Sequence, residues 1–478
     1  MANLVPSYTV TQNIANPTLL HFVDTSTGYN PYVDQRRIYL RKYDGTYLVP
    51  EGTTTDYIIW DYNLTEIDVD VMNKDYALEI SVEWVATQPI PKLFNIYATN
   101  IQSILGTSFQ VNVASNFVVD WGDGVLENYS SGTIDLTHTY DTPYTGNITF
   151  ALDKYDNINS IVISDTGDIT PSGTPLTIYT NELIKLTNIT NLSLDSNCSL
   201  LGDASGLPPT LTNLTIQNTN LSGSLTQLPT SLTQLVLRGT TTISGTLSQL
   251  PTTLTYCIIA GNSVITGNIS GLPVGITNIY LQGIGNITGN ISSLQSTVVE
   301  AVITCPNTIT GDISDLPPSI ITFVVKGSNS IGGNLMDLPN TLESFWVEGS
   351  NNISGDLSDI TSFASLKTFN VVGQNTITGD FGDLPSGITG CVLTGNNTVS
   401  DYTYPHTWHS GMNTIILNPL SGGLSSTEVD NLLINLAAVA IWTGDKIVTL
   451  KGANAARTAS SDAAVSTLNG YGVTVTTN

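Results

Sequence analysis

The sequence predicts a mainly β chain of several domains whose C-terminal half is a solenoid of stacked repeats. With 478 residues, the chain is too long for one hydrophobic core. Only 11% of its residues are charged, while Thr, Ser, Asn and Gly are abundant, which favours β-strands joined by tight turns. The evidence for the repeats is a glycine that recurs every 22 residues.

The periodic segment predicts one short strand in each repeat. Five residues after each repeat glycine stands a Leu or Ile, usually followed by Pro, and then a pattern such as Leu232-x-x-Leu235-x-Leu237. A lone repeat buries too few apolar side chains to offset the ordering of its backbone, so neighbouring repeats must stack. The glycines are Gly223, Gly245, Gly267, Gly289, Gly311, Gly333 and Gly355, with Gly379 after a spacing of 24.

These patterns resemble the leucine-rich-repeat family, especially its plant-type subclass, over about residues 186–420. The resemblance implies a curved parallel sheet on the concave side. Beyond it, Ser425-x-x-Glu428 is a capping-box pattern that opens a predicted helix at Glu428–Trp442. A strand at 446–451, a helix near 461–468 and a strand at 473–476 complete a predicted α/β cap that continues the sheet.

Two further modules precede the repeats. Val118-Val-Asp-Trp-Gly-Asp-Gly124 followed by Thr137-His-Thr-Tyr140 resembles the PKD-type immunoglobulin-like β-sandwich, and we expect His138 and Tyr140 to pack and hydrogen-bond near the turn. The first 90 residues carry strand-like runs at 57–62, 67–72 and 77–85 and an Asp44-Gly45 hairpin signal, which predicts a small β-sandwich. The predicted domains are therefore a β-sandwich at 1–90, a PKD-like domain at 91–165, the repeat solenoid at 166–420 and its cap at 421–478.

The repeat strands predict a candidate binding surface. The residue between the two inward apolar positions points to the concave face, and across the array it is mostly Val or Ile, with Tyr280, Trp346 and Asn370 among them. The functional interpretation is a partner- or glycan-binding face, and the alternative is plain β-propensity on a tolerant surface. The candidate surface residues are Arg238, Tyr256, Tyr280, Lys326, Trp346 and Glu348.

Oxygen-bearing side chains form two further columns, which could hold Ca²⁺ or could cap turns, and we favour capping. His406 and His409 are spaced i, i+3 without a nearby Glu, which is weak support for a metal site. We therefore expect no cofactor and no metal. The columns are Asn268, Asn290, Asp312, Asn334, Asp356 and Asp380, and Asp315, Asp337, Asp359 and Asp383.

The charge of the chain and its lack of catalytic motifs argue against several classes of function. The net charge of −25 with 14 basic residues argues against nucleic acid and against anionic lipid. No nucleophile elbow, P-loop or dinucleotide fingerprint is present, and no carboxylate pair is singled out, so the chain is predicted not to be an enzyme. Cys257 and Cys391 occupy core positions of the repeat, and no disulfide framework is indicated.

No charged and apolar secretory pattern opens the chain, and no apolar run is long enough to span a membrane. The N-terminal module and the cap, with Leu424-Ser-Ser-Thr-Glu-Val-Asp430 and Gly452-Ala-Asn-Ala-Ala-Arg457, resemble structural proteins of tailed phages of gut Bacteroides, including the crAss-like group. The resemblance implies a virion fibre or appendage on the head or tail. Its N-terminal domain would bind other virion proteins, and its solenoid would bind a host-surface glycan or protein, with a homo-oligomer possible.

Three alternatives stay open: a purely structural virion component whose concave face binds another virion protein, a bacterial surface adhesin, and a capsule-degrading enzyme.

Overall fold

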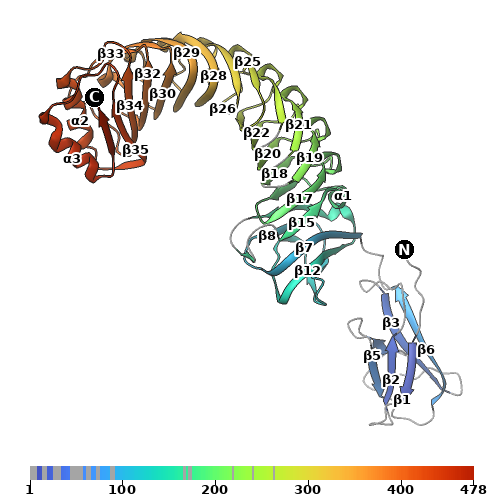
Figure 1. The fold of residues 1–478 in the computed structure, drawn as a ribbon. Helices are drawn as coiled ribbons and strands as arrows, with labels where there is room; N and C mark the ends of the chain where they lie inside the picture. Colours follow the sequence, from blue (N-terminus) through green and yellow to red (C-terminus); the bar gives the residue numbers. More distant parts are fainter. Residues whose placement is uncertain are drawn as a thin grey trace. The chain divides into compact units, whose positions relative to one another are not determined.

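The computed structural model shows a mainly β protein dominated by a large open sheet (Figure 1). It describes residues 92–478 apart from 165–167, 171–174, 218–219, 240–241 and 262–263, together with six strands within the first 86 residues. The Cα positions form two compact units. The first comprises residues 1–160, 166–176 and 185–188, and the second comprises 161–165, 177–184 and 189–478.

The N-terminal strands form two three-stranded antiparallel sheets, in the orders β1-β2-β5 and β4-β3-β6. The predicted strands near 57–62, 67–72 and 77–85 are present as β4, β5 and β6, whereas the Asp44-Gly45 hairpin turn lies outside the described residues. The bounds are β1 (Tyr8–Gln12), β2 (Leu19–Asp24), β3 (Asp34–Lys42), β4 (Ile58–Trp60), β5 (Glu66–Asp70) and β6 (Tyr76–Ala86).

A second antiparallel module follows, in which β7 pairs with β12 and β14, β9 pairs with β12 and β10, and β8 pairs with β11. Alternation of buried and partly exposed residues along β7, β8 and β9 places Phe94, Phe109 and Phe117 in its core. Its strands are β7 (Lys92–Ile104), β8 (Phe109–Val113), β9 (Phe117–Asp120), β10 (Leu126–Tyr129), β11 (Gly132–Asp135), β12 (His138–Leu152) and β14 (Ile169–Thr170). Connecting elements are η1 (Tyr155–Asn157), β13 (Ile158–Ile163), β15 (Leu176–Tyr179) and α1 (Thr180–Leu183).

In the second unit, each repeat contributes one strand to a parallel sheet, here called the first sheet, which lies on the inner side of the curved array (Figure 1). Its apolar strand residues, such as Leu235 and Leu237, are fully buried because they alternate with residues of the inner face. The strands are β16 (Asn191–Leu194), β18 (Asn213–Gln217), β20 (Gln234–Gly239), β22 (Tyr256–Gly261), β24 (Asn278–Gln282), β26 (Glu300–Thr304), β28 (Thr322–Asn334), β29 (Ser344–Asp356), β30 (Thr368–Gly373), β32 (Gly390–Gly395) and β34 (Met412–Pro419).

Short parallel strands and one 3₁₀ turn per repeat form the outer side of the array. The strands are β17 (Cys198–Asp203), β19 (Asn220–Ser224), β21 (Thr242–Thr246), β23 (Val264–Asn268), β25 (Ile287–Asn290), β27 (Asn307–Asp312), β31 (Thr376–Asp380) and β33 (Thr398–Asp401), continued by the second halves of β28 and β29. The turns are η2 (Ala204–Gly206), η3 (Leu225–Gln227), η4 (Leu247–Gln249), η5 (Ile269–Gly271), η6 (Ile291–Ser293), η7 (Ile313–Asp315), η8 (Leu335–Asp337), η9 (Leu357–Ile360) and η10 (Phe381–Asp383).

Buried polar and aromatic ladders run between the repeats. Asn351 illustrates the polar one: its Oδ1 accepts from Ile331 N at 3.0 Å, and its Nδ2 donates to Val372 O at 3.2 Å. This ladder was not predicted from the sequence, and its members are Asn307, Asn329, Asn351, Asn375 and Asn397. Phe323, Phe345 and Phe369 form the aromatic ladder, with ring centroids 6.0 Å apart at each step. Cys257 and Cys391 lie in the core as predicted, and burial raises the pKa of Cys257 to about 12.

The C-terminal segment continues the first sheet through β35 (Trp442–Leu450) and β36 (Thr474–Thr477). Ser425 and Glu428 form the predicted capping box of α2 (Ser426–Ala437). The helix ends earlier than predicted, because Trp442 belongs to β35 and pairs with Met412. The remaining elements are η11 (Ala459–Ser461) and α3 (Asp462–Gly470).

Candidate ligand-binding surface

One residue from each strand of the first sheet forms an in-register row on the inner face, here called the central column. Parallel pairing places each member directly beside the next, so the 22-residue spacing of the sequence becomes a single strand step. Most members are partly exposed, in contrast to the fully buried residues on either side of them. The column runs through Ser193, Thr215, Val236, Ile258, Tyr280, Val302, Val324, Trp346, Asn370, Val392, Ile416, Thr449 and Thr476.

The first group on this face, the tyrosine cluster, consists of Tyr256, Asn278, Tyr280 and Glu300. The rings of Tyr256 and Tyr280 lie 6.4 Å apart at an angle of 42°. Glu300 joins them, because its Oε2 accepts from Tyr280 OH and, at 2.7 Å, from Asn278 Nδ2. Burial, reinforced by the hydrogen bond to Glu300, raises the pKa of Tyr280, so the phenol stays protonated and Glu300 is the acceptor.

The second group, the tryptophan cluster, consists of Lys326, Trp346 and Glu348. Lys326 Nζ lies 3.1 Å from the centroid of the Trp346 ring, which is a cation–π contact. Glu348 Oε1 accepts from Trp346 Nε1 at 2.6 Å and lies 3.7 Å from Lys326 Nζ. One carboxylate therefore fixes both the indole and the ammonium, and the three side chains form one preorganised unit.

Five of the six residues predicted for the surface fall in these two clusters. Arg238 does not: it is exposed on β20, in register with Gln217 and Ala260. Asn278 and Glu300 were not predicted from the sequence. They lie two positions before Tyr280 and Val302, and their 22-residue spacing places them side by side on neighbouring strands. Three strand steps, about 14 Å, separate Tyr280 from Trp346.

The first oxygen-bearing column caps the 3₁₀ turns, as favoured from the sequence. Each cap residue accepts a hydrogen bond from the backbone N–H two residues later, for example Asp312 Oδ1 from Ser314 N at 3.0 Å. In the second column, Asp359 Oδ2 accepts from Asp356 N at 3.0 Å. The described residues contain no group of three or more His, Cys, Asp or Glu side chains that could hold a metal ion.

The two histidines near the C-terminal end of the array occupy different environments. His406 packs edge-on against Trp408, with 4.4 Å between ring centroids, and burial lowers its pKa. His409 is exposed. Their arrangement gives no support to a shared metal site.

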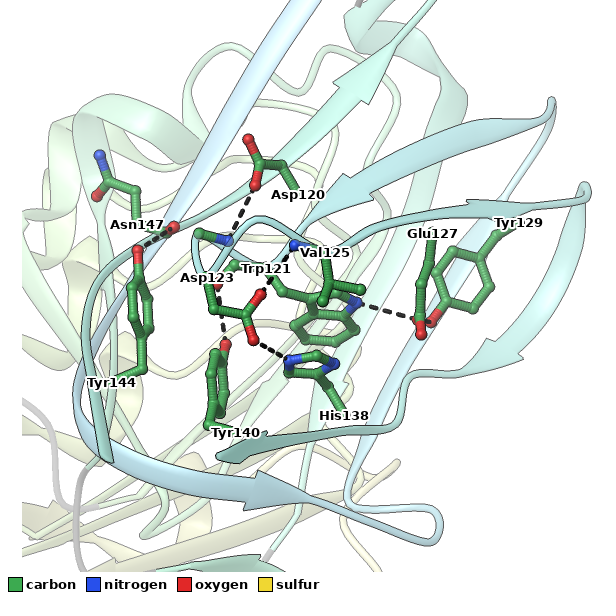
Figure 2. A network of polar contacts seen from close by, with 11 residues as sticks. Asp120, Trp121, Asp123, Val125, Glu127, Tyr129, His138, Tyr140, Tyr144 and Asn147 are labelled. Carbon is green, nitrogen blue, oxygen red and sulfur yellow. Dashed lines mark hydrogen bonds and ion pairs between the residues drawn. The ribbon is translucent and has the colours of Figure 1, made fainter. Parts of the chain in front are cut away.

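The Trp-Gly-Asp-Gly segment of the second module forms a closed network of aromatic and polar contacts (Figure 2). His138 stacks on Trp121 with ring centroids 4.6 Å apart, and its Nε2 lies 2.8 Å from Asp123 Oδ2. Tyr140 OH donates to Trp121 O at 3.1 Å, and Trp121 Nε1 donates to Glu127 Oε2 at 3.0 Å. The predicted packing of His138 and Tyr140 against the turn is confirmed. These two residues of β12 hold the turn that follows β9 in place.

No protein-family model matches the chain, and no curated protein shows significant sequence similarity to it. Within the described residues, none of the helices has the length and apolar character needed to cross a bilayer.

Proposed function

We propose that this protein is a non-enzymatic fibre or appendage component of a phage virion, in which a leucine-rich-repeat solenoid attaches to the host surface through its inner face. The observation that carries the proposal is the central column with its two preformed clusters. Aromatic rings held by carboxylates supply large contact area at low entropic cost, as recognition surfaces require.

The remaining parts of the chain take roles consistent with this function. The N-terminal strands are proposed as the domain that docks on other virion proteins, and the PKD-like module as a spacer whose aromatic network keeps it rigid. The resemblance to structural proteins of phages of gut Bacteroides supplies the class of host.

The test is binding of the fluorescently labelled full chain to intact Bacteroides cells, with Trp346→Ala beside the wild type. We expect saturable binding that Trp346→Ala weakens at least about tenfold, because truncating a central aromatic anchor costs 2 kcal/mol or more at a binding hot spot. Tyr471→Ala, which removes an exposed aromatic side chain of the C-terminal cap, is the matched control and should bind like the wild type. Absence of saturable binding to every strain tested would contradict the proposal.

A second candidate, a purely structural component, is favoured by the aliphatic part of the central column. Val302, Val324 and Val392 present apolar surface that another virion protein could cover. Under this alternative, antibodies raised against the Trp346 region would fail to label intact particles but would label disrupted ones. Labelling of intact particles would support host attachment instead.

A further inference from the structure

Asn370 is the one polar residue of the central column between Val302 and Ile416. Its register neighbours are Trp346 on β29 and Val392 on β32, and only 5% of Asn370 is exposed. Its Oδ1 is buried and accepts no hydrogen bond. Valine occupies the same row at Val392 on the adjacent strand and at Val324 two strands away, so an aliphatic side chain fits this row of the sheet.

A buried carbonyl oxygen without a donor destabilises the fold, because it has lost its water and gained no partner. Valine would avoid this loss. A polar group that is unsatisfied in the free protein, and that lies beside an aromatic side chain on an accessible face, is suited to a ligand that brings the missing donor.

We propose that the inner face binds a neutral saccharide, and that Asn370 Oδ1 accepts a hydrogen bond from one of its hydroxyl groups beside Trp346. This inference rests on the proposed function and specifies its ligand. Sugar rings combine apolar C–H faces, which pack on indole and phenol rings, with hydroxyl donors. The oxygen is covered in the free protein, so binding requires a neighbouring side chain other than Trp346, such as Val392, to shift.

The charges of the face select against acidic sugars. Glu300 and Glu348 lie at the centres of the two clusters, and both are acceptors for N–H or O–H donors. A uronic or sialic acid carboxylate would be repelled by Glu300 and by the net charge of −25. At the tryptophan cluster, Lys326 balances the charge of Glu348, so the repulsion is strongest at the tyrosine cluster.

The two clusters define an extended ligand. They lie about three strand steps apart, roughly 14 Å, so an oligosaccharide running across the strands contacts both, and a monosaccharide reaches only one. Affinity should therefore increase with chain length until both clusters are occupied.

The test uses the full chain, calorimetric titration, and neutral oligomers of glucose, mannose, galactose and N-acetylglucosamine of increasing length, with uronic-acid oligomers as the charged comparison. We expect at least one neutral series to bind and Asn370→Val to weaken that binding about tenfold or more, because the acceptor is lost. The Tm of Asn370→Val should equal or exceed that of the wild type. Thr449→Val, which removes a hydroxyl from the same column three strands further along, should leave affinity unchanged.

Several results would overturn the inference: wild-type affinity in Asn370→Val, equal binding of the uronic-acid series, no saccharide binding, or a lower Tm in Asn370→Val, which would show that Asn370 is satisfied in the fold. A cell-binding assay distinguishes failure of the saccharide inference from failure of the proposed attachment function. If the full chain binds Bacteroides cells, and binding survives both Asn370→Val and periodate oxidation of the cells, the attachment function stands with a protein receptor and the saccharide inference fails. If saccharides bind as described but cells do not, the inference stands and the attachment function fails.

Discussion

Two adjacent glycines in the array, Gly332 and Gly333, face different constraints. Gly333 has φ +119°, and a Cβ there would lie 2.6 Å from Asp312 Oδ1 and 3.0 Å from Ile313 N of the preceding repeat. At Gly332 the nearest atom to such a Cβ is Asn352 O, at 3.5 Å. The close approach of one repeat to the next therefore explains the periodic glycine.

Gly333→Ala should lower the free energy of unfolding by about 1–3 kcal/mol from the backbone conformation alone, with a further loss from the displaced cap. Gly332→Ala is the matched control and should change it by no more than about 0.5 kcal/mol. Urea denaturation followed by circular dichroism measures both. Equal midpoints for the two variants would mean that the repeats do not need this close approach.

At the scale of the element, the 3₁₀ turns depend on their caps, and the caps come in two chemical forms. Asp312 and Asp356 accept from Ser314 N and Ser358 N, whereas Asn290 and Asn334 make the same contact without a charge. The hydrogen bonds to Ser314 and Ser358 hold the pKa values of Asp312 and Asp356 below their usual range.

A pKa that is lower in the folded state than in the unfolded chain adds stability above the unfolded value, about 3.9, and this stability is lost as the pH falls through the folded value. The variant Asp312→Asn with Asp356→Asn should therefore match the wild type at pH 7, since Asn and Asp cap equally well. Its Tm should fall less between pH 5 and pH 3 than that of the wild type. Parallel Tm–pH curves would show that these two caps do not contribute to acid sensitivity.

Much of the arrangement of these elements could be predicted from the sequence. Strand positions, the central column and the capping box of α2 follow from spacing alone, because a parallel array converts sequence period into spatial neighbours. The end of α2 was wrong because pairing of Trp442 with Met412 overrides the helical pattern. The tyrosine cluster was incomplete because Glu300 reaches Tyr280 diagonally from the adjacent strand. The buried ladder of Asn351 was missed because asparagine is typical of exposed turns, whereas Asn351 is fully buried within β29.

At the scale of the whole molecule, the excess of 39 acidic over 14 basic residues produces mutual repulsion in the folded chain. Raising NaCl from about 10 mM to about 150 mM shortens the screening length from roughly 30 Å to about 8 Å, so the Tm should rise. Sucrose at equal osmolality serves as the control for effects other than screening. A Tm that falls with salt would indicate that attractive ion pairs, such as Lys367 with Glu343, outweigh the repulsion.

Because neighbouring strands of the first sheet pair in register, gain or loss of one repeat changes distances along the inner face by one strand step. Loss of 22 residues between Glu300 and Lys326 would keep the tyrosine cluster intact and bring it one strand step, about 4.8 Å, closer to Trp346. Every remaining core residue would keep an equivalent neighbour. Duplication of a repeat would move the clusters apart by the same step. Recombination among these similar repeats would thus change the length of ligand that this face accepts in single strand steps, without requiring a new fold or a new residue.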